Sequence, residues 1–279
     1  MATTTKATAP AKKKSGFGGI KNAWVIIVIC FIAAVLIFTQ IFGNPANFVN
    51  GDPAGHPLPG NMLGTVYKGG FVVPVIFTLL LTVFCLGIER FFALRSAFGT
   101  MSLGKFTIQV KELIKAGKFD EAEKLCNKMK GSVANVVMAS IRAYKDVESV
   151  SGMKKAQKIS KIQQAHEEAT QLEMPTLQMN LPIVATIVTL GTLTALFGTV
   201  LGMIRSFAAL SSGGGADSAA LSEGISEALV NTASGILTSW IAVVVYNFFT
   251  NKIDKLTYAL DEVGYTIATT YDVNHTDEL

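Results

Sequence analysis

The residues best suited to ion chemistry in this chain form a row of polar side chains beside a long apolar stretch. Glu227, Asn231, Ser234 and Thr238 recur at helical spacing, which places them on one face of a helix. A carboxylate in hydrocarbon costs about 2.5 kcal/mol or more unless it meets water or a partner, so such residues mark ion pathways. A second interpretation places Glu227 at the mouth of the helix, paired with Arg205. Both interpretations place it beside an outer opening.

Hydroxyl and small side chains are concentrated in the last two apolar stretches. The first of the two holds Thr186, Thr189, Thr192, Thr194 and Thr199, and the second adds Thr232, Gly235 and Ser239. Small residues let helices approach closely and hydroxyls bond across the contact, although a threonine can also bond its own backbone. The middles of these stretches lack Asp, His and Lys. Their absence indicates either that the chain carries no protons or that a second subunit supplies the carboxylate.

Four stretches carry no charge: residues 24–42, 71–88, 174–204 and 228–251. Each meets or exceeds the length of about 18 apolar residues at which a membrane-spanning helix is expected. Half of the 279 residues are apolar and 16% are charged. We predict an all-α integral membrane protein with four transmembrane helices and long cytoplasmic helical extensions.

Positive charge predicts the orientation in the membrane. Residues 1–23 hold five lysines and no acid, the segment 43–70 holds one lysine, and the segment 89–173 holds many basic residues. Because basic residues favour the cytoplasmic side, 43–70 and 206–222 are expected outside and both termini inside. The basic residues beyond the first segment are interleaved with acids and lie beside membrane spans, so we do not expect nucleic-acid binding.

These patterns divide the chain into segments. We expect a disordered basic cytoplasmic tail at 1–23 that contacts membrane lipid, a transmembrane helix at 24–42 and an irregular periplasmic loop at 43–70. A transmembrane helix at 71–90 should lead into a cytoplasmic helical domain at 91–173, which contains a helix–turn–helix broken at Ala116-Gly117. The rest should be a transmembrane helix pair at 174–250 with a short periplasmic loop, and a cytoplasmic tail at 251–279.

Nothing in the sequence suggests catalysis. Cys30, Cys85 and Cys126 have no metal-site or redox spacing, and we expect them to be packing residues. The sequence has no phosphate loop, nucleophile constellation or metal cluster. We therefore expect no enzyme activity, no cofactor and no metal.

Two long motifs resemble the MotA/TolQ/ExbB proton channel family. They are LPIVATIVTLGTLTALFGTVLGMIRSF (181–207) and GISEALVNTASGILTSWIAVVVYNF (224–248). Weaker similarity covers the rest of 71–250, through IERFFALR, KAGKFDEAEKL and EMPTLQMNLP. The helix at 24–42 is additional to the spans of ExbB-like relatives.

The resemblance implies a homopentamer that encloses single helices of an ExbD- or TolR-like subunit. That partner carries the membrane aspartate that takes up and releases protons, while hydroxyls of the five subunits line the path. Glu227 and Thr232 match family positions, and Thr189 falls at a position commonly Ser or Asn. The expected ion pathway comprises Thr189, Thr192, Thr199, Glu227, Asn231 and Thr232. Thr192 and Ile241 stand where the family often has proline. These departures leave open whether the transported ion is a proton or sodium.

The main hypothesis is an ion-channel-forming subunit of a proton-motive-force-driven motor in the bacterial inner membrane. It would energise outer-membrane transport through a TonB-type system. A TolQ-like subunit, a gliding or secretion motor subunit, and a non-conducting membrane scaffold are the alternatives. A solute transporter is disfavoured, because the two pairs of spans show no convincing internal repeat.

Overall fold

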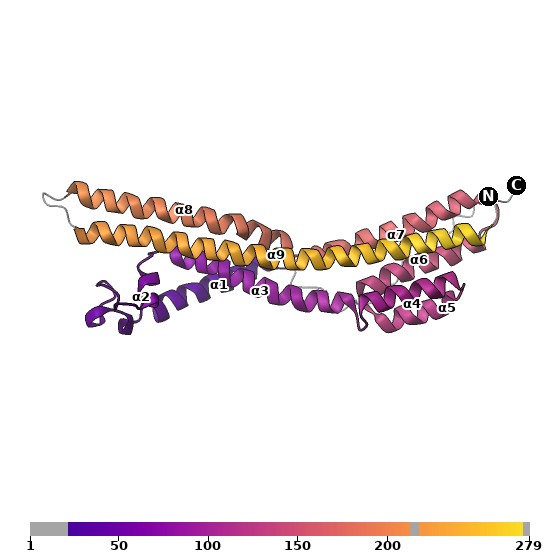
Figure 1. Cartoon of the computed structure of the whole chain (residues 1–279), viewed down its shortest axis with the longest axis horizontal. Helices are drawn as coiled ribbons and strands as arrows, with labels where there is room; N and C mark the ends of the chain where they lie inside the picture. The colour runs from indigo at the N-terminus through magenta and orange to yellow at the C-terminus, as the bar shows by residue number, and fades with distance from the viewer. Residues whose placement is uncertain (1–21, 213–217, 276–279) are drawn as a thin grey trace, which may run out of the picture. The chain divides into compact units, whose positions relative to one another are not determined.

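The structure, a computed structural model, describes residues 22–212 and 218–275, and this part of the chain forms helices and no extended strand. Most of the predicted tail at 1–23 lies outside the described residues. The helices are α1 (Ala23–Ile37) with a π-helical turn η1 (Phe38–Phe42), α2 (Met62–Tyr67), α3 (Val72–Phe98), α4 (Leu103–Lys115), α5 (Phe119–Met129), α6 (Gly131–Ser149), α7 (Lys155–Gln178), α8 (Leu181–Ser212) and α9 (Ser218–Asn274) (Figure 1).

Four of these helical stretches are long and apolar enough to cross a membrane. They lie within Ala23–Phe42, Val72–Lys115, Leu181–Ser211 and Ala219–Asn274. The prediction of an all-α membrane protein with four spanning helices is confirmed. The chain is a multi-pass membrane protein.

The chain divides into two compact units, which are described separately here. One, the membrane unit, holds residues 22–90 and 178–251 of the described chain. The other, the polar unit, holds residues 91–177 and 252–275.

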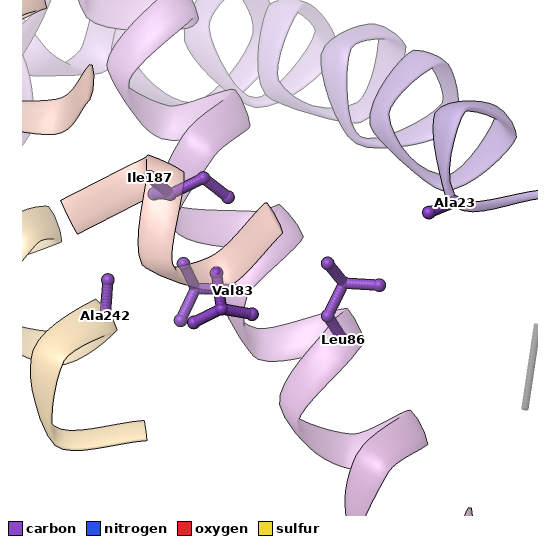
Figure 2. Close-up of a cluster of buried hydrophobic side chains, with 6 residues drawn as sticks. Ala23, Val83, Leu86, Ile187 and Ala242 are labelled. Carbon is purple, nitrogen blue, oxygen red and sulfur yellow. The ribbon is translucent and has the colours of Figure 1, made fainter. Parts of the chain in front are cut away.

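All four spans contribute to one apolar core in the membrane unit. Ala23 of α1, Val83 and Leu86 of α3, Ile187 of α8 and Ala242 of α9 meet there, each at least nine-tenths buried (Figure 2). Many large apolar side chains of the same helices remain exposed on the single chain, among them Trp24 on α1 and Trp240 on α9. Helices that are apolar all round are expected where lipid or protein covers the outer face.

The loop between α1 and α3 is more ordered than its prolines and glycines predict. Asn61 accepts hydrogen bonds from the backbone N–H groups of Leu63 and Gly64, which caps α2. Stacking of Phe38 on Tyr67, with ring centroids 4.7 Å apart, joins the end of the first span to this short helix. The expectation of an irregular loop at 43–70 is therefore wrong for α2, because capping and aromatic packing stabilise this helix of six residues.

The third span begins later than the expected boundary at residue 174. Residues 174–178 continue α7, and α8 begins at Leu181 after Asn180, whose φ is 65°. Pro182 lies in the first turn of α8 and fits a break at this point, whereas Pro175 lies inside α7 without ending it. In the first turn of a new helix the missing N–H costs nothing.

The connection expected at 206–222 is mostly helical. α8 continues to Ser212 and α9 begins at Ser218, so only residues 213–217, which lie outside the described residues, separate them. Alanine and leucine dominate the flanking sequence, and both are strong helix formers. The helices are consequently longer than the uncharged stretches that identified them.

The polar unit contains the predicted helix–turn–helix. α4 ends at Lys115 and α5 begins at Phe119, with Gly117 at φ 70° between them. The segment 251–279, expected as a tail, instead continues α9 as far as Asn274. One face of this part of α9 is buried, and it consists of Ile253, Leu256, Leu260, Val263, Ile267 and Tyr271. That spacing is an amphipathic helix, so this segment is part of the core of the polar unit.

A buried histidine lies inside the polar unit. Ser140 Oγ lies 3.1 Å from the carbonyl oxygen of Val136 and 2.9 Å from Nδ1 of His166, and the tautomer of the ring decides which atom donates in the second contact. The other ring nitrogen, Nε2, is buried without a hydrogen-bond partner among the described residues. It lies against Gly264, where a Cβ would come within 2.6 Å of it. This arrangement accommodates the neutral ring.

We predict that acid destabilises the polar unit through His166. Burial lowers the pKa of His166 from 6.5, although Asp261 and Glu167 act in the opposite direction. The unfolded chain therefore binds the proton more readily. The stabilisation is complete above pH 6.5 and is lost as the pH falls through the lowered pKa, by at most about 1.4 kcal/mol per pH unit. Denaturant unfolding followed across this range measures it, and His166→Gln should flatten the dependence. Equal slopes for the two proteins would contradict the prediction.

Candidate functional site

Small residues bring α8 and α9 into close contact between Gly191 and Gly202 of α8. A Cβ at Gly198 would lie 2.8 Å from Asn231 Cγ, and one at Gly202 would lie 2.7 Å from the carbonyl oxygen of Gly224. Gly235 approaches the carbonyl oxygen of Gly191 in the same way, at 2.6 Å. The helices run side by side in Figure 1. Their backbones are near enough for short hydroxyl side chains to reach across.

The first cross-helix hydroxyl pair is Thr199 with Thr232, whose Oγ1 atoms lie 2.5 Å apart. Each hydroxyl also lies 3.0 Å from a carbonyl of its own helix, that of Ala195 or Ala228. The two protons cannot fill all three hydrogen bonds at once. One hydroxyl must donate to the other, and the direction of this short chain can reverse. That is the chemistry required to pass a proton between hydroxyl groups.

A second pair lies seven residues along each helix. Thr192 Oγ1 and Ser239 Oγ are 2.9 Å apart. Seven residues span about 10 Å of helix, so the two pairs lie roughly two turns apart on the same contact. Thr192 was a predicted pathway residue, whereas Ser239 was noted only as one of several hydroxyls.

Glu227 lies beyond the first pair, toward the beginning of α9. Both of its carboxylate oxygens accept from Nη1 of Arg205 at 2.6 Å. Its side chain is only 6% exposed, against 54% for Arg205. The pairing with Arg205 considered from the sequence is therefore present. Together with the two hydroxyl pairs, it makes a line of polar contacts between α8 and α9.

Asn231 is wholly buried, and neither its Oδ1 nor its Nδ2 has a hydrogen-bond partner among the described residues. A buried amide without partners costs about 1–3 kcal/mol and requires an explanation. Asn231 is next to Thr232 in sequence and one helical turn from Glu227. Its amide therefore lies beside the line of polar contacts without a hydrogen bond to any described residue.

The remaining predicted residues separate into two positions. Thr189 is exposed on the surface of the single chain. Thr238 is buried and donates to the carbonyl of Ser234 within α9, at 2.9 Å. The row from Glu227 to Thr238 thus lies largely inside the chain, and the polar side chains of α9 that contact α8 are Glu227, Thr232 and Ser239.

Some residues around this site were not found from the sequence. Gly70 lies against Glu227, and Lys68 pairs with Glu223 at 2.9 Å. Nothing in the loop sequence indicated which part of α9 it would contact. Within the described residues, no three His, Cys, Asp or Glu side chains gather as a metal site requires.

Comparison with known proteins agrees with this arrangement. The family model described as the MotA/TolQ/ExbB proton channel family matches residues 130–262, which include all of α8 and the part of α9 up to residue 262, with Glu227. ExbB-like protein 3 of Synechocystis sp. is 39% identical over 87 residues, covering 30% of this chain and 41% of that protein. An ExbB homolog of Methanothermobacter thermautotrophicus is 26% identical over 199 residues, covering 70% and 66%.

A third relative is named as a protein of the Tol-Pal system. The Tol-Pal system protein TolQ of Pseudomonas aeruginosa is 29% identical over 124 residues, which covers 44% of this chain and 54% of that protein. The chain thus spans about two-fifths to two-thirds of the lengths of these relatives. Residues 130–262, which carry the glycine contacts, the hydroxyl pairs and the Glu227–Arg205 pair, belong to the MotA/TolQ/ExbB proton channel family.

Proposed function

We propose that this chain forms the ion channel of a proton-motive-force-driven motor in the bacterial inner membrane and energises outer-membrane transport through a TonB-type system. The observation that carries the proposal is the Thr199–Thr232 pair, at 2.5 Å, in line with the Glu227–Arg205 pair. Helix packing alone needs small residues, but it does not need a carboxylate beside reversible hydroxyl bonds.

The ion would pass along these groups with help from a second polypeptide. The middles of α8 and α9 supply hydroxyls and an amide but no titratable acid. A partner helix of ExbD or TolR type would bring the membrane aspartate that binds and releases the proton. The unpaired amide of Asn231 could then hold water, or sodium if that is the ion.

The uncovered apolar faces of the spans support an assembly of several copies of this chain. Phe197 and Leu229, both more than half exposed, belong to broad apolar faces of α8 and α9. Lipid or further copies of this chain would cover these faces, and a homopentamer would leave room for the partner helix. Both termini would be cytoplasmic, the polar unit would form the cytoplasmic helical extensions that transmit force, and the chain would have no enzymatic role.

A non-conducting scaffold is the second candidate. The glycine contacts between α8 and α9, and the threonines that bond their own backbones, are also what tight helix packing produces. Similarity to TolQ as well as to ExbB-like proteins leaves a TolQ-like motor as the related alternative.

We expect Thr199→Val and Thr232→Val to separate a channel from a scaffold. Valine keeps the shape of threonine and removes the hydroxyl, so assembly should survive while ion-driven flux falls about tenfold, the effect of one lost hydrogen bond in the path. The measurement is proton uptake by liposomes that hold the complex purified from its own membranes. Thr186→Val is the matched control, because Thr186 bonds only the carbonyl of Pro182 in its own helix. Unchanged flux in both hydroxyl variants would favour the scaffold.

A further inference from the structure

The segment of residues 68–71, which we call the strap, joins the loop at 43–70 to α3 and contacts α8 and α9. At its first residue, Lys68 Nζ donates to Glu223 Oε1 at 2.9 Å and to the carbonyl of Ala54 at 2.8 Å. The Lys68 side chain is 13% exposed and that of Glu223 is 55% exposed. Lys68 therefore connects the loop to the first turns of α9.

The third residue of the strap lies directly against the ion pair. Gly70 has φ +71°, and a Cβ there would lie 2.6 Å from Glu227 Oε1 and 3.6 Å from Arg205 Nη1. A positive φ favours glycine, and so does the closeness of the carboxylate. The next residue, Phe71, has its ring 5.9 Å from the guanidinium carbon of Arg205.

These contacts explain an asymmetry within the pair. Glu227 is covered almost completely, while Arg205 remains more than half exposed. The carboxylate has α8 on one side and the backbone of Gly70 on another. Removing the strap would expose the Glu227 carboxylate to solvent, whereas Arg205 is already exposed.

We propose that the strap positions the Glu227 carboxylate against Arg205 and limits the access of water and cations to it from the side of the loop at 43–70. Gly70 is a positioning residue, and the Lys68–Glu223 pair holds the strap closed. The proposal rests on the proposed function, since it assigns entry control to the same site. The loop that precedes the strap then has a role in the pathway beyond connecting two spans.

Chemical labelling of Glu227 tests the strap in membranes that contain the full chain. A water-soluble carbodiimide with a small amine nucleophile converts an accessible carboxylate to an amide, and mass spectrometry measures the rate at Glu227. Lys68→Met should raise this rate about fivefold, the effect of losing one partly exposed ion pair that opposes opening. Gly70→Ala should raise it as well, because the new Cβ displaces the carboxylate.

Gly60→Ala is the matched control for the glycine variant. Gly60 has φ +80°, similar to that of Gly70, but a Cβ there meets nothing within 4 Å. Its substitution causes the same backbone strain without the collision, so labelling of Glu227 should not change. Gly70→Ala should destabilise the protein less in a Glu227→Ala background than in the wild-type chain. Gly60→Ala should lower the stability by the same amount in the two backgrounds.

The outcomes distinguish the strap from the channel. Should Gly70→Ala fail to fold, Lys68→Met still provides the labelling test. Wild-type labelling rates in Lys68→Met and in any folded Gly70→Ala would overturn the strap proposal. Labelling does not depend on conduction. Faster labelling in these variants, together with no proton flux through the wild-type complex, would support the strap and overturn the proposed function alone.

Discussion

Replacing Glu227 by glutamine is expected to reduce ion-driven flux between about 10-fold and 100-fold, the kinetic equivalent of a lost charge-assisted hydrogen bond of about 1.5–3 kcal/mol. Glutamine has almost the same size, so the packing against Gly70 is preserved. It cannot neutralise Arg205, whose Nη1 donates to both carboxylate oxygens at 2.6 Å. The positive charge would then stand uncompensated at the end of the line of hydroxyl pairs and repel a cation.

The measurement is proton uptake by liposomes containing the purified complex, compared at equal amounts of assembled protein. Asp254→Asn is the control, because Asp254 is an exposed acid on the same helix within the polar unit. Flux in Glu227→Gln equal to that of the control would show that the buried carboxylate serves only to hold α8 and α9 together.

Replacing Arg90 by methionine is expected to cost about 3–5 kcal/mol of stability, because it leaves a buried carboxylate without its charge partner. Arg90 is fully buried, and its Nε donates to Glu89 Oε2 at 2.6 Å. Asn180 Nδ2 donates to the same carboxylate oxygen at 3.3 Å. The pair therefore connects α3 to the break between α7 and α8.

Unfolding in mixed detergent micelles measures this effect. Arg95→Met, on the same helix but exposed, should change stability by less than about 0.5 kcal/mol. The double substitution Glu89→Gln with Arg90→Met should cost less than Arg90→Met alone, since no buried charge remains. A loss in Arg90→Met no greater than in Arg95→Met would contradict the role assigned to the buried pair.

The sequence by itself determined the helical class, the four spans and the helix–turn–helix at Gly117, because these depend on local composition. A run of uncharged apolar residues has to satisfy its backbone inside itself when it leaves water, and a helix does so. The helix spacing of the buried residues between Ile253 and Tyr271 was also present in the sequence, although the segment was predicted as a tail.

Only the tertiary structure decided which polar groups meet. The hydroxyls of Thr199 and Thr232 are 33 residues apart, and Gly70 lies against Glu227 across more than half the chain. A helical repeat assigns a side chain to a face, but it does not state which other helix covers that face or at what height. Those facts arise from close packing between distant segments, where the loss of one Cβ at a glycine lets two backbones approach.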